Sequence, residues 1–227
     1  MKLFKSARAT GTETLSPPRS RRSLVILSSI TLWLLVVGIG LSVLLGYENT
    51  PGAAAQPAAS WPDDSQIQRA PGRATLVMLI HPHCPCSRAS LGELALLMAQ
   101  SQGRLAAYVL FLKPEGFSNN WEKTDLWQSA ASIPGVKPIV DHDGVEARRF
   151  HARTSGQTVL YDAEGHLLFS GGITVARGHA GDNAGRSAIV SLLNANVAEQ
   201  TETPVFGCPL FDDNSDCRKP NHERNKN

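Results

Sequence analysis

The sequence predicts an α/β domain with a central mixed sheet, preceded by one transmembrane helix. An uncharged apolar stretch lies near the N-terminus, at residues 23–47. After it, short apolar runs typical of buried strands alternate with segments whose apolar residues recur every three or four positions, as they do in helices. Of the 227 residues, 42% are hydrophobic, which excludes a chain that is disordered throughout.

Residues 23–47 are long enough to cross a bilayer, because a helix rises about 1.5 Å per residue and the hydrocarbon core is about 30 Å thick. A cleaved signal peptide has a shorter apolar core of about 7–15 residues, and no small-x-small site follows this one directly. We therefore expect an uncleaved anchor, although the alanines within 53–59 leave a later cleavage open.

The first 22 residues carry six basic side chains and one acidic one, a formal charge of +5. Because the whole chain has a net charge of +2, the rest carries −3. By the positive-inside rule the basic tail, 1–22, stays in the cytoplasm and the main domain faces the outside. In a bacterium this places the chain in the inner membrane with its domain in the periplasm. The acidic remainder lacks the basic patch of a nucleic-acid-binding protein, so no such partner is expected.

Residues 48–72 are rich in Pro, Ala, Gln and Asp without a helical or strand period, which predicts a flexible linker. The folded domain is expected over 73–199 and a C-terminal tail over 200–227. Strands are predicted at 74–80, 105–112, 137–140, 157–161 and 166–169. Helices are predicted from 87 to the turn at Gly103, over 121–133 and 145–151, and after a cap at Asp182 or Asn183.

Cys84 and Cys86 stand between the first predicted strand and the first predicted helix. Unpaired N–H groups and the macrodipole at a helix N-terminus stabilise an anion, which lowers the pKa of a thiol below its ordinary value of about 8.5. Cys84 is therefore the predicted nucleophile. Cys86 lies two residues further on and can resolve a mixed disulfide formed at Cys84. The pair indicates thiol–disulfide exchange.

The order of elements and three stretches of sequence resemble the thioredoxin-like superfamily over residues 74–198, a little over half of the chain. The stretches are HPHCPCSRASLGEL at 81–94, TVLYDAEGHLLFSGGIT at 158–174 and RGHAGDNAG at 177–185. In these details the chain resembles the membrane-anchored RedB-type branch. The resemblance implies a three-layer sandwich around the mixed sheet and a redox-associated protein of the cell envelope.

Two departures from the thioredoxin-like pattern bear on the chemistry. The superfamily usually has two residues between its cysteines, whereas the single residue here makes a smaller, more strained ring, which favours an oxidant or isomerase over a strong reductant. The superfamily also has a proline before the strand that faces the cysteines, and 154–158 (TSGQT) has none. Because that proline loop normally shapes the substrate site and keeps metals off the thiols, its loss favours metal binding.

The alternative function is therefore a copper-binding carrier or metallochaperone. His81, His83, Cys84 and Cys86 bring two imidazoles and two thiols within six residues, and such ligands suit Cu(I) or Zn(II). His179 could complete the site. An oxidoreductase of this kind needs no cofactor, whereas the carrier would hold copper. A non-catalytic redox sensor and an inert structural pair are further readings of the same cysteines.

Five side chains are candidates for tuning the Cys84 thiolate or for binding substrate. They are His83, Arg88, Gln157, Arg177 and His179. Arg88 lies in the first turn of the helix, and Arg177 precedes a helix N-terminus, a combination that suits an anion. Each also has a purely structural reading, as a solvated side chain or as part of a glycine-rich connector. Glu93 is expected on a solvated helix face unless it acts as a general base.

Cys208 and Cys217 form a second pair in the tail, separated by eight residues. In an oxidising compartment a structural disulfide between them is expected. The alternative is a shuttle, in which 206–210 fold back so that Cys208 exchanges with Cys84 or Cys86. The sequence does not decide between the two.

Together these features predict a membrane-anchored, extracytoplasmic thiol–disulfide oxidoreductase. Its expected partners are cysteine-containing envelope proteins and a membrane electron donor or acceptor that resets the thiols. The lipid bilayer is expected around the N-terminal helix.

Overall fold

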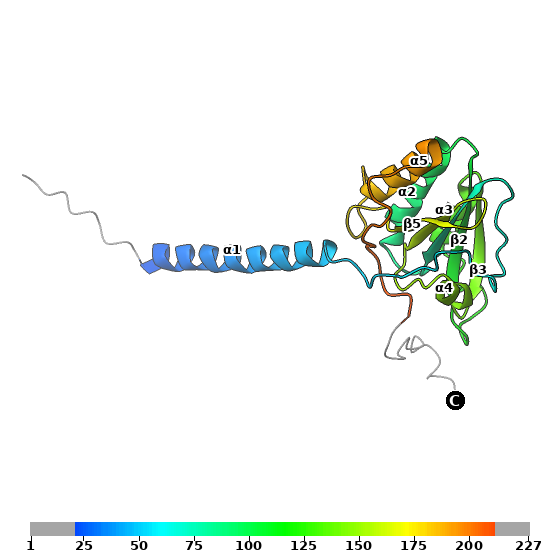
Figure 1. Ribbon diagram of the computed structural model, residues 1–227. Helices are drawn as coiled ribbons and strands as arrows, with labels where there is room; N and C mark the ends of the chain where they lie inside the picture. The colour runs from blue at the N-terminus through cyan, green and yellow to red at the C-terminus, as the bar shows by residue number, and fades with distance from the viewer. Residues whose placement is uncertain (1–20, 212–227) are drawn as a thin grey trace, which may run out of the picture. The chain divides into compact units, whose positions relative to one another are not determined.

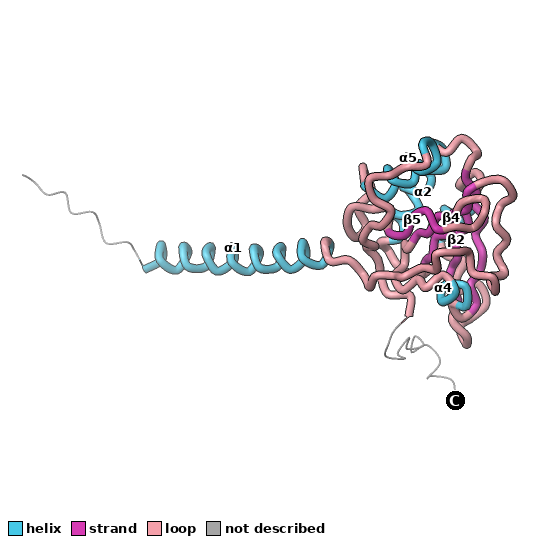
Figure 2. The backbone as a smooth tube through the Cα atoms, in the orientation of Figure 1, coloured by secondary structure: helices cyan, strands magenta, loops and turns pink. Residues whose placement is uncertain are grey.

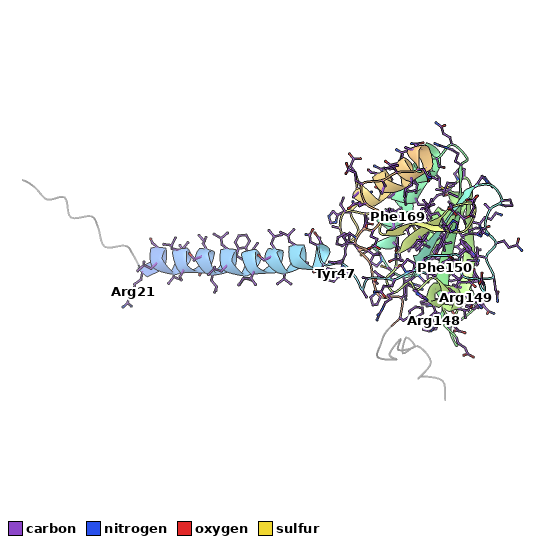
Figure 3. The ribbon with its side chains drawn as sticks, in the orientation of Figure 1. Arg21, Tyr47, Arg148, Arg149, Phe150 and Phe169 are labelled. Atoms are coloured by element: carbon purple, nitrogen blue, oxygen red, sulfur yellow. The ribbon has the colours of Figure 1, made fainter. Side chains whose placement is uncertain are left out.

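The computed structural model describes residues 21–211. The chain forms two compact units that divide after Leu44. Helix α1 (Arg21–Glu48) begins in the first unit, and Arg21 and Tyr47 mark its two ends in Figure 3. Within the described residues, α1 is the one helix long and apolar enough to cross a membrane. It contains the whole of the stretch predicted to span the bilayer.

The second unit is built on a five-stranded mixed sheet (Figure 1). Its elements, in chain order, are β1 (Ala74–Ile80), α2 (Ser87–Gln100), β2 (Leu105–Lys113), α3 (Asp125–Ser132), β3 (Val136–His142), α4 (Val145–Arg149), β4 (Thr158–Tyr161), β5 (Leu167–Gly171) and α5 (Ala184–Ala195). The strand order is β3-β2-β1-β4-β5. Strands β1, β2 and β3 are parallel, and β4 and β5 are antiparallel to their neighbours. The predicted mixed sheet is thus confirmed.

The sheet is buried on both faces, which makes the domain a three-layer sandwich. Side chains alternate along β1, so that Leu76, Met78 and Ile80 join one core and Val77 and Leu79 join the other. The first core lies under α2, α3 and α5 and contains Phe169, while the second lies under α4 and contains Phe150 (Figure 3). This explains why every residue of the first strand except Thr75 is apolar, rather than every second one.

Helix α3 begins four residues later than predicted. The stretch before it, 118–123, forms turns, with Asn120 in the left-handed region at φ 68°. Trp121 donates its backbone N–H to Ser118 O at 3.2 Å, and its ring contacts His83 instead of joining a helix. The aromatic side chain is thereby moved from the predicted helix to the neighbourhood of the cysteines.

The structure differs from the flexible linker expected over 48–72. Glu48 is the last residue of α1, and residues 49–72 pack on the domain without forming a helix or strand of their own (Figure 2, pink). Trp61 makes edge-to-face contacts with Phe150 and Tyr161, at centroid distances of 5.1 and 5.2 Å. Ile67 is buried in the same core. The Tyr161 hydroxyl donates to Ala58 O at 3.0 Å. The small helix α4 leaves much of this face uncovered, and the segment supplies the missing apolar contacts.

Candidate active site

Cys84 lies where the chain leaves the central strand and enters helix α2. Its backbone N–H donates to His81 O at 3.0 Å, and its carbonyl accepts from Ser87 N at 3.1 Å. These turns before α2 carry the thiol beneath the surface, where Cys84 is only 1% exposed. The predicted order of strand, cysteine pair and helix is therefore present.

The thiol in contact with Cys84 comes from the far end of the chain. Cys208 Sγ lies 2.8 Å from Cys84 Sγ, and the backbone N–H of Cys208 points to the same sulfur at 3.4 Å. A disulfide bond would be about 2.03–2.05 Å long, so these are two free thiols in close contact. Cys86 is also free. The expected pairing of Cys208 with Cys217 involves a residue outside the described range.

The surroundings of Cys84 stabilise its thiolate. The largest effect is the hydrogen bond from the Cys208 thiol, and together with weaker donors it lowers the pKa of Cys84 to about 4. The weaker donors are the Cys208 backbone N–H, the Ser87 hydroxyl and the Cys86 backbone N–H. Burial acts in the opposite direction, because it disfavours the charged form. The donors outweigh burial, so Cys84 is a thiolate at neutral pH.

The other two thiols hold their protons more tightly than usual. Burial and the negative charge at Cys84 raise the pKa of Cys86. The hydrogen bond that Cys208 donates to Cys84 raises the pKa of Cys208, and burial adds to this effect. The Arg177 guanidinium opposes both shifts through its positive charge. The site therefore holds one thiolate and two neutral thiols.

Ser155 links the cysteine turn to the loop before β4. Its hydroxyl accepts from His81 N at 2.8 Å and lies 2.8 Å from the Ser87 hydroxyl. Its backbone N–H donates to Cys208 O at 2.8 Å. Ser155 and Ser87 were not among the predicted site residues. A single serine in a loop carries no sequence signal, and Ser155 is recognisable only because it stands in the stretch where the thioredoxin-like proline is missing.

Arg177 donates hydrogen bonds to two segments beside the site, one that precedes the sheet in the chain and one that follows α5. Its Nε donates to Thr50 O at 3.1 Å, and its Nη1 donates to Gly207 O. Its guanidinium also lies over the Tyr47 ring, 4.9 Å from the centroid. The residue predicted to bind an anion thus contacts backbone carbonyls of this chain.

The histidines near the cysteines contact aromatic and backbone groups. His83 Nε2 lies 3.2 Å from Trp121 O, and because a carbonyl only accepts, this nitrogen carries the proton. His81 Nδ1 accepts from His83 N at 3.2 Å. His179 Nδ1 lies 2.9 Å from Arg177 O on the exposed loop. Within residues 21–211, no three or more His, Cys, Asp and Glu side chains gather in a group that could hold a metal ion.

Two other predicted side chains have partners outside the cysteine turn. The Arg88 guanidinium pairs with the exposed Asp125 carboxylate at the start of α3. Gln157 is buried and donates from its side-chain amide to Ser170 Oγ at 3.0 Å. The structure thus brings Cys84, Cys86, Cys208 and Ser155 together and directs Arg88 and Gln157 to structural contacts.

Several solved structures resemble the chain, and three of them show the extent of the likeness. A hypothetical protein from Sinorhizobium meliloti 1021 aligns with a TM-score of 0.51 and 20% identity, over 71% of this chain and 93% of that one. An uncharacterized conserved protein from Geobacillus kaustophilus gives 0.53 and 18%, over 74% and 94%. A secreted Mycobacterium tuberculosis disulfide oxidoreductase homologous to E. coli DsbE gives 0.40 and 14%, over 55% and 83%. No family model and no curated protein matches the chain.

At these identities the likeness concerns the fold and not the activity. The topology gives the same result, because a strand, a cysteine turn and a helix lead into a sheet whose last two strands run antiparallel. The second unit of this chain therefore has the thioredoxin-like fold that the sequence predicts.

Proposed function

We propose that the domain performs thiol–disulfide exchange with Cys84 as its nucleophile. The observation that carries the proposal is a buried thiol at the start of α2 in contact with a second thiol of the same chain. The thiolate is the reactive species in disulfide exchange, and the lowered pKa of Cys84 keeps it in that form at neutral pH. A structural cysteine needs neither property.

In the exchange, the Cys84 thiolate attacks one sulfur of a partner's disulfide, and the partner's other sulfur leaves as a thiolate. A second thiol of this chain then gives up its proton and attacks Cys84 Sγ, which releases the partner with two thiols. Two electrons pass to the partner, and this chain is left with a disulfide. The same steps in reverse oxidise a partner dithiol. The sequence offers Cys86 as the second thiol.

We further propose that α1 anchors the protein in the bacterial inner membrane with the domain in the periplasm, as in the RedB-type branch that the sequence resembles. Suitable partners are cysteine-containing envelope proteins. A membrane electron donor or acceptor would reset the thiols, because each turnover leaves the pair in the opposite redox state. The apolar composition of α1 and the basic residues before it support this placement.

The proposal is tested on the full chain in detergent, equilibrated anaerobically in glutathione redox buffers. Acid quenching, alkylation and peptide mass spectrometry then report the state of each cysteine. We expect a reversible two-electron transition that Cys84→Ser abolishes and Cys217→Ser leaves intact. The reduced chain is also titrated with Cu(I) against a competing chelator. One tightly held copper ion, together with a Cys84 that does not change state in any buffer, would overturn the proposal in favour of the carrier.

A further inference from the structure

The chain after α5 returns to the cysteine site as an extended segment, residues 201–211, which we call the C-terminal segment (Figure 1, orange to red). It pairs with the edge strand β5, where Ser170 N donates to Thr201 O at 2.9 Å and Thr203 N donates to Ser170 O at 3.2 Å. Further along, Gly52 N donates to Val205 O at 2.8 Å. Val205 and Leu210 are buried. The segment is therefore an integral part of the domain.

At the cysteine site the C-terminal segment pairs antiparallel with residues 153–155. The bridge is centred on Thr154 and Pro209, with Ser155 N donating to Cys208 O and Leu210 N donating to Arg153 O, both at 2.8 Å. Main-chain pairing of an extended peptide is a general way for a protein to bind a peptide and place its side chains. Here it places the Cys208 side chain on the nucleophile.

Close approach of the two backbones depends on Gly207. A Cβ at this position would lie 1.9 Å from Ser155 O, far inside van der Waals contact. Any other residue would force the segment away from the loop before β4. Gly207 therefore allows the neighbouring cysteine to reach Cys84.

We propose that Cys208 is the resolving thiol of this site, and that the C-terminal segment occupies the position of a substrate peptide as an internal substrate. The inference rests on the proposed function, since it names the second thiol of that exchange. Closing the gap between Cys84 Sγ and Cys208 Sγ to bonding distance takes less than about 1 Å. A Cys84–Cys86 bond would instead close a small ring across a single residue.

A partner disulfide first yields a mixed disulfide at Cys84 and one free partner thiol. Cys208 then loses its proton and attacks Cys84 Sγ, the bond between Cys84 and the partner breaks, and the partner leaves as its second thiol. The partner gains two electrons and two protons, and this chain keeps a Cys84–Cys208 disulfide. For a partner to bind in this way, the segment must leave the loop at residues 153–155 and then return.

The test uses the full chain in detergent with Cys217→Ala in every variant, so that three cysteines compete. Reduced protein is mixed with oxidised glutathione, and mass spectrometry follows the loss of glutathionylated Cys84. In the Cys86→Ala variant, we expect the glutathione adduct at Cys84 to disappear at nearly the parent rate and a Cys84–Cys208 disulfide to form. In the Cys208→Ala variant, we expect the glutathione adduct at Cys84 to disappear at least tenfold more slowly than in the parent. The disulfide is identified because trypsin cleavage after Arg88 and Arg186 leaves the two cysteines on separate peptides.

The opposite pattern would overturn the proposal: fast loss in Cys208→Ala and a persistent glutathione adduct in Cys86→Ala would identify Cys86 as the resolving thiol. That result would leave the proposed function standing. If Cys84 acquires no glutathione in any variant, the proposed function itself fails. The two failures are therefore distinguishable.

A second variant tests the role of the segment without removing a cysteine. Gly207→Ala should slow formation of the Cys84–Cys208 disulfide at least tenfold, because the added methyl group collides with Ser155 O. Gly92→Ala is the matched control, since Gly92 lies on the exposed face of α2 and a methyl group added there would meet no atom within 4 Å. Equal rates for the Gly207 variant and the parent would contradict the proposed position of the segment.

Discussion

Glu93 of α2 and Arg186 of α5 form a buried ion pair, with Arg186 Nη1 3.2 Å from Glu93 Oε2 and the Glu93 side chain only 1% exposed. The same carboxylate accepts from Gly181 N at 2.7 Å and from the Asn183 side-chain amide at 3.1 Å. Glu93 therefore fixes the loop before α5 to the helix that begins at the cysteine site. Glu93 is therefore buried and does not lie on the solvated helix face that was expected. None of its described contacts reaches a thiol, so the structure gives no support to a general-base role.

Glu93→Ala should destabilise the domain by about 3–5 kcal/mol, because it leaves a buried guanidinium and two donors without their acceptor. Urea unfolding of the reduced full chain in detergent measures the loss. Asp182→Ala is the control, since Asp182 pairs with the same arginine but its side chain is fully exposed. Equal effects of the two substitutions would show that burial of the pair is unimportant.

Trp61→Ala should cost about 2 kcal/mol, less than the roughly 3–5 kcal/mol of a fully buried aromatic, because Trp61 is only half-buried. The loss comes from its contacts with Phe150 and Tyr161. Trp61→Phe should recover much of the stability by keeping a ring in place. Thermal unfolding checks both variants. An alanine variant as stable as the parent would show that the packing of Trp61 does not stabilise the domain, as expected if residues 48–72 were a flexible linker.

Cys208→Ala should raise the pKa of Cys84, because it removes the thiol donor that has the largest effect on that group. The pH profile of Cys84 alkylation, followed on the isolated peptide, separates two effects. Its midpoint should move up from about 4 towards the ordinary thiol value of about 8.5, and its plateau at high pH should rise because Cys84 becomes more accessible. Cys86→Ala should move the midpoint much less. An unshifted midpoint in Cys208→Ala would show that Cys208 does not stabilise the thiolate.

The stability of the reduced protein should rise with pH relative to Cys84→Ala. Because the folded pKa of Cys84 lies near 4 and the unfolded value lies near 8.5, the unfolded state binds more protons between these limits. The contribution is therefore complete above the unfolded pKa and is lost as pH falls towards 4, with a slope of up to about 1.4 kcal/mol per pH unit. Urea unfolding from pH 5 to 8 measures the difference. Parallel curves would mean an ordinary thiol at Cys84.

The local pattern of residues was sufficient to predict the helices and strands, because each of these elements is a run of residues close together in the chain. The apolar run of β1, the helical period after Ser87 and the cap at Asn183 lie within a few residues of their predicted positions. They were predictable because strands and helices leave a period in the sequence.

The contacts that complete the site, and those that fasten α5 to α2, join distant parts of the chain and leave no such period. Cys208 lies 124 residues from Cys84, and Glu93 finds its partners on another helix and its preceding loop. A charged side chain in a helix is usually exposed, which is why Glu93 was expected in solvent. The folded-back tail was one of two alternatives for Cys208 because its position depends on main-chain pairing with residues 153–155, which composition does not reveal.

Because Cys84 and Cys208 are far apart in the chain, Cys84 is synthesised well before the thiol that it contacts in the folded domain. At about 5–20 residues per second, the ribosome adds Cys208 roughly 6–25 s after Cys84. Throughout that interval Cys86 is the one other cysteine in the nascent chain. If the nascent chain meets an oxidant in this interval, the one intramolecular disulfide that it can form is Cys84–Cys86. A Cys84–Cys208 pair can then form only if the Cys84–Cys86 disulfide is avoided, or is exchanged after Cys208 has been added.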